Sequence, residues 1–488
     1  MRLRRAAGVA LALGALLPAA APALERLPAA LHVHSDLTTG DHSLAALAAA
    51  AERQGIEALL LAENYLLRVE YGVPPFRALT RVTWEEPSVL AAGVDRYLAR
   101  VAEARRRHPR VLLVPGVEVM PHYYWTRERF ALHLTVHDTQ KNLLVFGVTD
   151  PAALAALPVA GNRRAGLTWQ SALEAIPALL VVAGVGVLAR KHGRRRRLGR
   201  LMVGVRRRRR VIGAALVAIG AAALVRGWPF LQDPYPPWAP AGLAPHQALI
   251  DRVEGLGGAA VWSFPEAPDA GERRFGPVRV TWRTEPHADD LLRTFRYTAF
   301  GALYEQPTRV TEPGGVWDRL LAQYAAGERS RPAWAVGESG FHDTSAGKRL
   351  GAVQTVLLVS ERSEAGVLQA LRRGRLYALK RTPDSALVLA EFAVTGGAGT
   401  AGPGDTLAVP AGARIELRLA IEATAGAEPV RVILVRNGVA AEAWAGRTPF
   451  HATYRETYDG APLVLRVDVR GRAPHHLVAS PVFVQAPR

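Results

Sequence analysis

The chain has 488 residues, of which 49% are hydrophobic and 21% charged, and this composition excludes a disordered or collagen-like protein. The absence of cysteine excludes disulfide bonds, thiolate nucleophiles and cysteine metal sites. The net charge of +18 points to nucleic acid or anionic lipid as a partner, but twelve of the basic side chains lie together within residues 190–210. Because the rest of the chain has an ordinary charge balance, we expect no nucleic-acid partner.

The first residues have the features of an export signal. Three arginines within the first five residues precede the apolar run Ala6–Pro18, and Ala21–Ala23 has the A-x-A pattern of a cleavage site. We assign residues 1–23 to a signal peptide or an uncleaved signal anchor. Both alternatives export the segment that begins near Leu24.

Short apolar strands alternate with amphipathic helices over the next part of the chain. The pattern predicts strands at Ala30–His34, Ala58–Ala62, Val111–Val117 and Leu143–Val148, and helices at Ser43–Gln54 and Val94–Arg107. Ser43 is a candidate cap for the first of these helices. The alternation predicts parallel βαβ units, in an open sheet or a barrel, and we assign residues 24–170 to the first part of this α/β unit.

Two uncharged stretches, Ala175–Ala189 and Val211–Val225, bracket the basic segment 190–210. Each would form a helix of about 22 Å, shorter than the roughly 30 Å hydrocarbon core, but counting from Trp169 restores a spanning length. Trp169 and Trp228 also stand where an interfacial aromatic belt is expected. The pattern predicts a membrane hairpin over residues 171–228, with lipid as its partner. The alternatives are two buried core helices or a basic loop that binds a polynucleotide.

The positive-inside rule places the basic loop in the cytoplasm and the flanking parts outside, which agrees with the export signal. We therefore expect a bacterial-type inner-membrane protein whose soluble parts are both extracytoplasmic. After the hairpin, helices are predicted at His246–Leu256, Trp317–Ala326 and Ser363–Arg373, and strands at Ala259–Ser263, Trp334–Val336 and Val353–Val359. Residues 229–383 form the second part of the α/β unit. From residue 384 to 488, alternating strands separated by Gly and Pro predict a β-sandwich.

Polar residues at strand ends carry the candidate chemistry. His32 and His34 end the first strand, where residues two apart share one face, so both imidazoles can face one ion. An isolated H-x-H is more often a pair of surface or core histidines. Glu118 ends another strand and His342 follows a later one, and functional side chains gather at such ends in parallel α/β folds.

These residues, in this order, resemble the PHP (polymerase and histidinol phosphatase) superfamily, whose fold is a distorted seven-stranded α/β barrel with up to three divalent metals. The family's opening H-x-H-S-x-x-S-D-G is similar to HVHSDLTTG at residues 32–40, where Thr38-Thr39 replaces Ser-Asp. The resemblance extends to about Tyr377. It implies a PHP-type (β/α)7 barrel interrupted by the hairpin, as in an exported branch of the family in which a β-sandwich follows.

The chain also departs from the family pattern. Of nine ligand positions, the resemblance retains His32, His34, Glu118 and His342, and Glu63 keeps a carboxylate where the family has Asp. The other four positions carry Asn64, Asn142, Phe264 and Gly340. Neutral amides are weak ligands, and phenylalanine and glycine offer none, so a full trinuclear centre is not expected.

The retained set implies one divalent ion, Zn²⁺ or Mn²⁺, with His32, His34 and Glu118 as ligands, Glu63 as a further candidate, and His342 as fourth ligand or acid/base. The alternative is a pocket that has lost its metal. Weaker candidates lie near the changed motifs: His133, His137, Asp138, Glu266, Glu338, Asp343 and the aromatic run Tyr123–Trp125.

Two functions remain open at the level of sequence. One is a membrane-tethered, metal-dependent phosphoesterase-like hydrolase that acts outside the cytoplasm on a small phosphorylated or envelope ligand. The other is a non-catalytic membrane protein that uses the PHP fold as a scaffold for an envelope ligand or partner.

Overall fold

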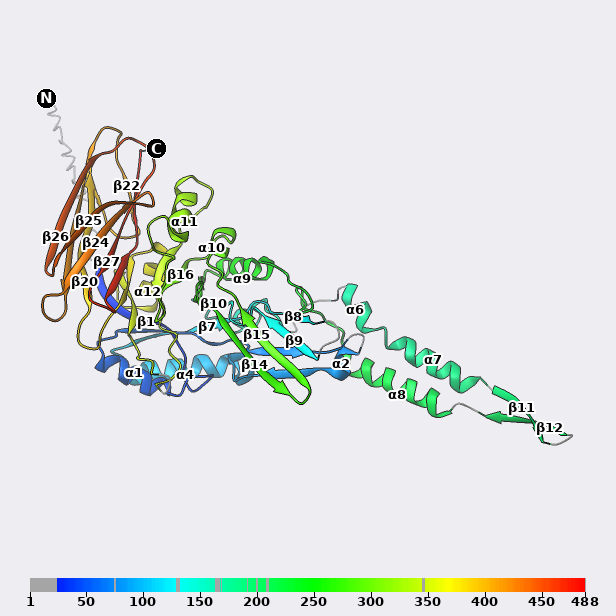
Figure 1. The fold of residues 1–488 in the computed structure, drawn as a ribbon. Helices are drawn as coiled ribbons and strands as arrows, with labels where there is room; N and C mark the ends of the chain where they lie inside the picture. The colour runs from blue at the N-terminus through cyan, green and yellow to red at the C-terminus, as the bar shows by residue number, and fades with distance from the viewer. Residues whose placement is uncertain are drawn as a thin grey trace, which may run out of the picture.

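The computed structural model describes residues 24–73, 76–128, 132–162, 167, 169–190, 192–198, 201–207, 210–344 and 347–487. The export signal predicted at residues 1–23 lies outside the described residues. Figure 1 shows an α/β body from which a pair of helices projects on one side, with a strand-rich C-terminal region on the opposite side.

The α/β body contains two sheets, and the chain crosses from one to the other several times. In the first, β6 (Leu112–Val114), β2 (Ala58–Leu61) and β1 (Glu25–Val33) are parallel neighbours. The second has the order β3 (Glu63–Asn64), β7 (Gly116–Val119), β10 (Leu143–Phe146), β13 (Ala259–Trp262), β16 (Ala299–Leu303) and β17 (Trp334–Gly337). The chain passes from β2 into β3 and from β6 into β7, which connects the sheets at one side. At the other side, Ser339 N donates to Leu31 O at 2.8 Å, which returns the chain beyond β17 to β1.

The body is continuous across the projecting helices. Strand β10 precedes them in the sequence and β13 follows them, yet the two strands pair over four residues. The segments on both sides of the projecting helices therefore contribute strands to one sheet. The expectation of parallel strands throughout is wrong at β10, which is antiparallel to both β7 and β13. The reason is that the segment after β7 forms a hairpin and brings the chain back to the same end of the sheet.

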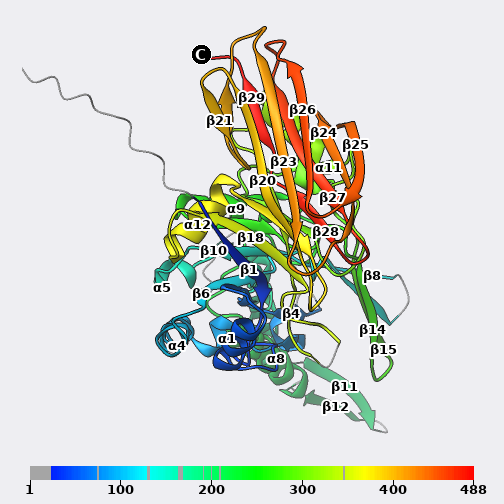
Figure 2. The ribbon, with the colours of Figure 1, turned by 90° about the vertical axis from the view of Figure 1, so that its left-hand side faces the viewer.

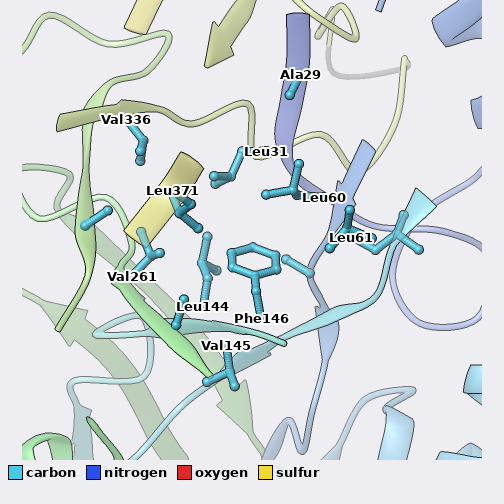
Figure 3. Close-up of a cluster of buried hydrophobic side chains, with 14 of the residues drawn as sticks. Ala29, Leu31, Leu60, Leu61, Leu144, Val145, Phe146, Val261, Val336 and Leu371 are labelled. Atoms are coloured by element: carbon cyan, nitrogen blue, oxygen red, sulfur yellow. The ribbon is translucent and has the colours of Figure 1, made fainter. Parts of the chain in front are cut away.

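Five longer helices cover the body: α1 (Leu44–Arg53), α4 (Val94–Arg107), α9 (Ala244–Gly255), α11 (Val316–Ala325) and α12 (Glu364–Arg373). Their bounds lie within two residues of the predicted ones, because each has an amphipathic pattern with an apolar face toward the strands. The Ser43 hydroxyl accepts from Ala46 N at 3.2 Å and caps α1 as expected. The apolar faces meet strand side chains such as Leu31, Leu144 and Phe146 in the buried core (Figure 3).

Three arms extend the body, and the sequence pattern did not predict them. They are β4 (Arg68–Tyr71) with α2 (Arg77–Thr80) and β5 (Val82–Glu85), the pair β8 (Tyr124–Arg127) and β9 (His133–His137), and the pair β14 (Asp269–Phe275) and β15 (Val278–Thr284). The last two pairs form one four-stranded sheet. Short helices α3 (Val89–Ala92), α5 (Pro151–Leu154) and α10 (Asp290–Arg293) complete the body.

The projecting helices are α7 (Ala178–Ala189), preceded by α6 (Trp169–Glu174), and α8 (Arg210–Gly227). The stretches Ser171–Ala189 and Arg210–Gly227 have mean hydropathies of 2.2 and 1.7 and are long and apolar enough to cross a membrane by length and composition. Most of their residues are not buried within the protein. The segment predicted as a basic loop contains a two-stranded ribbon, β11 (His192–Leu198) and β12 (Leu201–Arg207), at the tip of the helix pair (Figure 1).

The C-terminal region is rich in strands, as predicted. β18 (Val353–Val359) and β19 (Leu376–Lys380) extend the first sheet of the body, and β19 pairs with β28 (His476–Ala479). That sheet continues through β27 (Leu463–Arg470), β29 (Val482–Gln485), β22 (Thr406–Ala408), β24 (Pro429–Arg436) and β25 (Val439–Arg447). A four-stranded sheet contains β21 (Gly399–Ala401), β20 (Leu387–Gly396), β23 (Arg414–Ala423) and β26 (Phe450–Thr457). Apolar side chains of both sheets form one buried cluster, and Figure 2 shows the long strands of this region beside the body.

Candidate metal centre

The first strand is irregular where it carries its two histidines. The register of β1 against β2 shifts between Leu31 and Val33, and His32 has a φ of 71°, in the left-handed region. Simple strand alternation, the basis of the prediction that His32 and His34 share a face, is therefore interrupted. The bulge turns the His32 side chain so that both imidazoles still point to one place. A strained non-glycine residue at this point is typical of a functional site.

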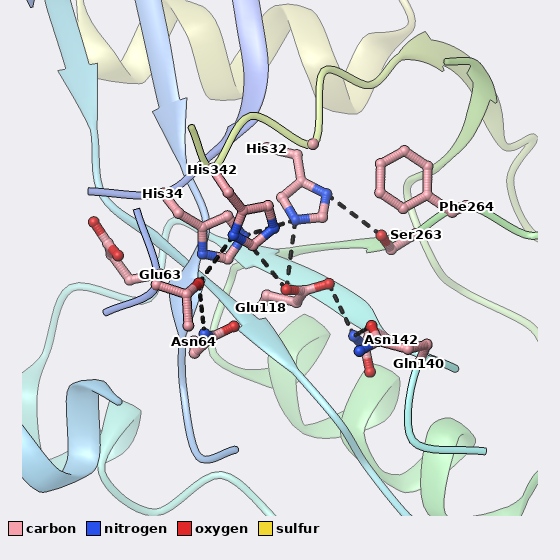
Figure 4. Close-up of polar contacts among 12 residues, drawn as sticks. His32, His34, Glu63, Asn64, Glu118, Gln140, Asn142, Ser263, Phe264 and His342 are labelled. Atoms are coloured by element: carbon pink, nitrogen blue, oxygen red, sulfur yellow. Dashed lines mark hydrogen bonds and ion pairs between the residues drawn. The ribbon is translucent and has the colours of Figure 1, made fainter. Parts of the chain in front are cut away.

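Three imidazoles converge at the strand ends. One ligand nitrogen from each of His32, His34 and His342 lies within 4.8 Å of the other two. The rings of His34 and His342 stack with centroids 3.9 Å apart. Glu118 Oε2 lies 3.4 Å from His34 Nε2 and 3.5 Å from His32 Nε2 (Figure 4). The fold thus brings together all four ligand residues that the family resemblance retains.

Glu338 orients His32. Its Oε1 accepts from His32 Nδ1 at 2.6 Å and from the Ser263 hydroxyl at 2.5 Å, and its Oε2 accepts from Phe264 N at 3.0 Å. Gly301 makes this position available, because a Cβ there would lie 1.9 Å from Glu338 Oε2. With Nδ1 engaged by a carboxylate, Nε2 of His32 faces the other histidines, which is the usual arrangement behind a metal-ligating imidazole. The sequence marked Glu338 only as a weak neighbour of a changed motif.

Burial and charge give the buried groups different protonation states. Burial lowers the pKa of His32, but Glu118 and Glu338 outweigh it and raise that pKa to about 9. Burial opposes ionisation of Glu118, yet His32 and His34 hold the pKa of its carboxyl well below the usual value. Burial, with nearby positive charge, lowers the pKa of His34, and it lowers that of His342 to about 3. His34 and His342 are therefore neutral at physiological pH, the form in which imidazole binds metals.

Glu63 does not face the three imidazoles. Its carboxylate accepts from Ser35 N at 2.9 Å and from the hydroxyls of Ser35 and Thr38. Burial raises the pKa of Glu63 to about 7. The carboxylate therefore holds the loop after β1, and the structure does not bring it into the cluster of candidate ligands.

The changed family positions contact the retained ones. Asn142 Nδ2 donates to Glu118 Oε1 at 2.9 Å. Asn64 Nδ2 donates to the Thr39 hydroxyl at 3.0 Å, and that hydroxyl shares a hydrogen bond of 2.9 Å with His342 Nδ1. These amides therefore support candidate ligands instead of adding to them. Sequence reasoning could not find this role, because it depends on contacts between distant segments.

Two further changes fit each other. The Phe264 ring stacks on His32 at a centroid distance of 5.2 Å. Gly340 has a φ of 53°, and a Cβ at this position would lie 2.5 Å from Phe264 Cζ. An aspartate, which the family pattern has at this position, would therefore clash with the phenylalanine ring. The apolar ring covers His32 on the side of the cluster where the family pattern has further metal ligands.

The residues of the cluster fit one divalent ion. His34 Nδ1 and Asn142 Oδ1 are buried without a hydrogen-bond partner among the described residues. Three imidazoles and a carboxylate make up a donor set that suits Zn²⁺ and similar ions. Lys348, which the sequence did not single out, adds a positive charge nearby, with its Nζ 2.7 Å from Gly340 O.

The remaining candidates have other contacts. His133 and His137 lie on β9, where they bond Glu128 and Thr126. The Glu266 carboxylate accepts from the backbone N–H groups of residues 309 and 310. Tyr123 and Trp125 hold β4 through Glu70, since the Tyr123 hydroxyl accepts from Glu70 N and Trp125 Nε1 donates to Glu70 O. These groups have structural roles.

No model of a known protein family matches the chain, and no curated protein matches it. Among solved structures, it is similar to a two-domain protein of Bacteroides vulgatus containing a predicted PHP-like metal-dependent phosphoesterase, at 10% identity and a TM-score of 0.35, over 91% of this chain and 90% of that one. It is also similar to a protein of Bifidobacterium adolescentis named as a metal-dependent phosphoesterase, at 15% identity and a TM-score of 0.28, over 66% of this chain and 90% of that one. An amidohydrolase of Chromobacterium violaceum is 13% identical with a TM-score of 0.26, over 66% and 89% of the two chains.

All three TM-scores are below 0.5, and the assignment of the site rests on the contacts of this chain's own residues.

Proposed function

We propose that the chain is a membrane-tethered hydrolase of phosphoester bonds that works with one divalent ion, Zn²⁺ or Mn²⁺, held by His32, His34, His342 and Glu118. The convergence of three imidazoles and one carboxylate carries this proposal. The strand segments from β1 through β17 and back to β1 support a distorted (β/α)7 barrel around the site, and the two-sheet C-terminal region supports a β-sandwich.

Each residue has a definite task in this proposal. A bound divalent ion supplies Lewis acidity, which polarises a phosphoryl oxygen and lowers the pKa of bound water toward roughly 7. Glu338 accepts the hydrogen bond from Nδ1 of His32, so that Nε2 would face the ion once a metal displaces its proton, and Thr39 supports His342. Lys348 brings a positive charge to the rim, where it would attract an anionic phosphoester. His342 and Glu118 are partly buried whereas His32 and His34 are fully buried, so an entering substrate would meet the side of the cluster that carries His342 and Glu118.

The membrane part of the proposal rests on the projecting helices. The stretch Ser171–Ala189, which contains the end of α6 and all of α7, would be about 28 Å long as one helix, close to the roughly 30 Å hydrocarbon core. We infer that the pair spans a bacterial-type inner membrane with segment 190–210 in the cytoplasm and both soluble parts outside. Protease added to intact cells should then cleave the C-terminal region. Cleavage confined to segment 190–210 would reverse the orientation.

The metal centre is tested by measuring the metal content of the full-length protein after loading with Zn²⁺ or Mn²⁺, together with hydrolysis of a phosphodiester. We expect one ion per chain, retained by His133→Ala, whose imidazole lies on β9, and lost by His34→Ala. Two or three ions per chain would contradict the single-ion centre.

The non-catalytic scaffold remains the second candidate, and the four changed ligand positions favour it. Asn64, Asn142, Phe264 and Gly340 support or enclose the histidine cluster without adding a strong ligand. A protein that takes up no ion from excess Zn²⁺ or Mn²⁺ would establish this alternative.

A further inference from the structure

The three arms of the body begin where the candidate ligands end their strands. The segment β4–α2–β5 follows Asn64, the pair β8–β9 follows β7 with Glu118 and leads back to Asn142, and the pair β14–β15 follows Ser263. All three arms therefore extend from the same rim as the metal centre.

The base of the apolar helix pair packs on these arms. Helix α2 contacts α8, and Arg77 of α2 lies 3.6 Å from Glu174 at the end of α6. Beyond α8, Pro237 O accepts from Trp125 N of β8 at 2.9 Å. Figure 1 shows α2, β8, β9 and the β14–β15 pair on the side of the body from which α7 and α8 project. The site rim and the start of the helix pair thus lie on one side of the molecule.

Large apolar side chains are exposed on the arms. Val82 and Trp84 of β5 are 69% and 49% exposed, Leu132 beside β9 is 63% exposed, and Phe275 of β14 is 49% exposed. Exposing such side chains to water does not stabilise a protein, whereas Trp and aliphatic residues are stabilised at the boundary between lipid headgroups and acyl chains. Their position beside the base of a membrane-spanning pair identifies the bilayer surface as their environment.

Polar groups at the same junction suit lipid headgroups. A cavity of about 100 Å³ lies between α2 and the base of the helix pair. Its lining includes Trp238, the arginines Arg77, Arg81 and Arg226, and the carboxylates Glu70, Glu174 and Asp233. The Arg77 guanidinium lies 3.8 Å from the centroid of the Trp238 ring. Arg226, at the end of α8, is exposed and has no ion pair within the part of the chain that the structure describes. Arg77 and Arg81 pair with the carboxylates of Glu174 and Glu70, so Arg226 is the arginine of this cavity that would meet a lipid phosphate.

We infer that the substrate of the metal centre is a phosphoester in the headgroup of a membrane lipid, reached from the bilayer surface on which the arms rest. This inference rests on the proposed function and adds the class of substrate. The spanning helices fix the distance of the site from the membrane, and the apolar arm tips fix its orientation toward the surface. A lipid headgroup then enters the site from the bilayer, without leaving it for water.

The test uses the full-length, metal-loaded protein in lipid nanodiscs. Two bilayer probes, phosphatidic acid and phosphatidylglycerol, are compared with two soluble ones, p-nitrophenyl phosphate and bis(p-nitrophenyl) phosphate. The double variant Val82→Asp, Trp84→Asp should reduce hydrolysis of a bilayer probe by at least about tenfold and change that of a soluble probe less than about twofold. The matched control is Val439→Asp, since Val439 is 68% exposed on β25 in the C-terminal region. It should change neither rate.

A second readout does not depend on activity. Because the chain has no cysteine, Val82→Cys and Val439→Cys each accept a single fluorescent label. We expect lipids that carry a quencher to quench the label at position 82 and to leave the label at position 439 unaffected.

Hydrolysis of soluble probes alone, or equal loss of both activities in the double variant, would overturn the lipid substrate and leave the proposed hydrolase intact. Hydrolysis of no probe would overturn the proposed hydrolase, and the lipid substrate with it. An unquenched label at position 82 would overturn the position of the arms at the bilayer.

Discussion

At the scale of single residues, the candidate centre differs from the family pattern in a coordinated way. A residue that no longer offers a ligand atom supports or encloses one that does, as Asn142 does for Glu118 and Phe264 does for His32. Replacing one changed residue by its family counterpart is therefore not expected to restore a second metal. The Gly340 and Phe264 pair shows why, since the ring occupies the space that a side chain at position 340 needs.

This coupling predicts a result for Gly340→Ala. The positive φ costs a non-glycine residue about 1–2 kcal/mol, and the contact with Phe264 adds to that cost. Gly276→Ala is the matched control, because Gly276 has a φ of 60° and open space around its Cβ position. Chemical unfolding should show a larger loss for Gly340→Ala than for the control. In a Phe264→Ala background the excess should shrink by about 1 kcal/mol. An unchanged excess would contradict the coupling.

At the scale of elements, the apolar helix pair is held together by close backbone contact. A Cβ on Gly184 of α7 would lie 2.8 Å from Gly213 O of α8, whereas a Cβ on Gly186 would meet nothing within 4 Å. Small residues at such crossings let membrane helices approach closely. Gly184→Ala should lower the melting temperature of the protein in nanodiscs, with a cost of about 1–3 kcal/mol. Gly186→Ala should leave it unchanged or raise it slightly, and equal effects of the two substitutions would show that the helices are packed differently.

A buried histidine beside β13, away from the candidate metal centre, makes the free energy of unfolding depend on pH. His287 packs beside Trp262 of β13, and burial lowers the pKa of this histidine from 6.5 to about 4. Because the unfolded chain takes up this proton near pH 6.5 and the folded protein only near pH 4, protonation favours unfolding. The stabilisation is complete above pH 6.5 and is lost as the pH falls through about 4. The loss amounts to about 3 kcal/mol when complete. His287→Gln should flatten the pH profile of unfolding over this range, whereas replacement of exposed His451 on β26 by Gln should not.

At the scale of the whole molecule, a buried ion pair joins the C-terminal region to the body. Arg466 of β27 and Asp318 of α11 share two hydrogen bonds of 2.6 Å, and the Arg466 side chain is fully buried. Asp318→Ala would leave a buried charge unpaired, so we expect a loss of about 3–5 kcal/mol in unfolding free energy. Asp289→Ala removes the partner of Arg319 in an exposed pair at the same helix and should cost less than about 0.5 kcal/mol. Similar losses in the two variants would refute the role of the buried pair.

Local patterns determined much of the secondary structure. The helix at Val94–Arg107 has the predicted bounds because a single buried face imposes its periodicity on the sequence, and the strand at Val353–Val359 has them because it is a largely apolar run buried on both faces. The arms were not predicted, although Val278–Thr284 of β15 has the alternation of a strand; other arm strands, such as β5 and β14, are mostly exposed and give a weaker signal. In β14, for example, Asp269–Phe275 contains two arginines and a glutamate and no apolar alternation.

The sequence by itself determined the four residues of the candidate centre, because His32, His34, Glu118 and His342 stand in local motifs at strand ends. Only the tertiary structure decided what surrounds them. Glu338 meets His32 across 306 positions of sequence, and Glu63 turns to the loop after β1 although its chemistry suits a metal. The physical reason is that a motif specifies which side chains are present, whereas the direction in which each side chain points and its hydrogen-bond partners depend on how distant strands pack. The same packing places the strand ends that carry the candidate ligands on the side of the molecule from which the apolar helices project.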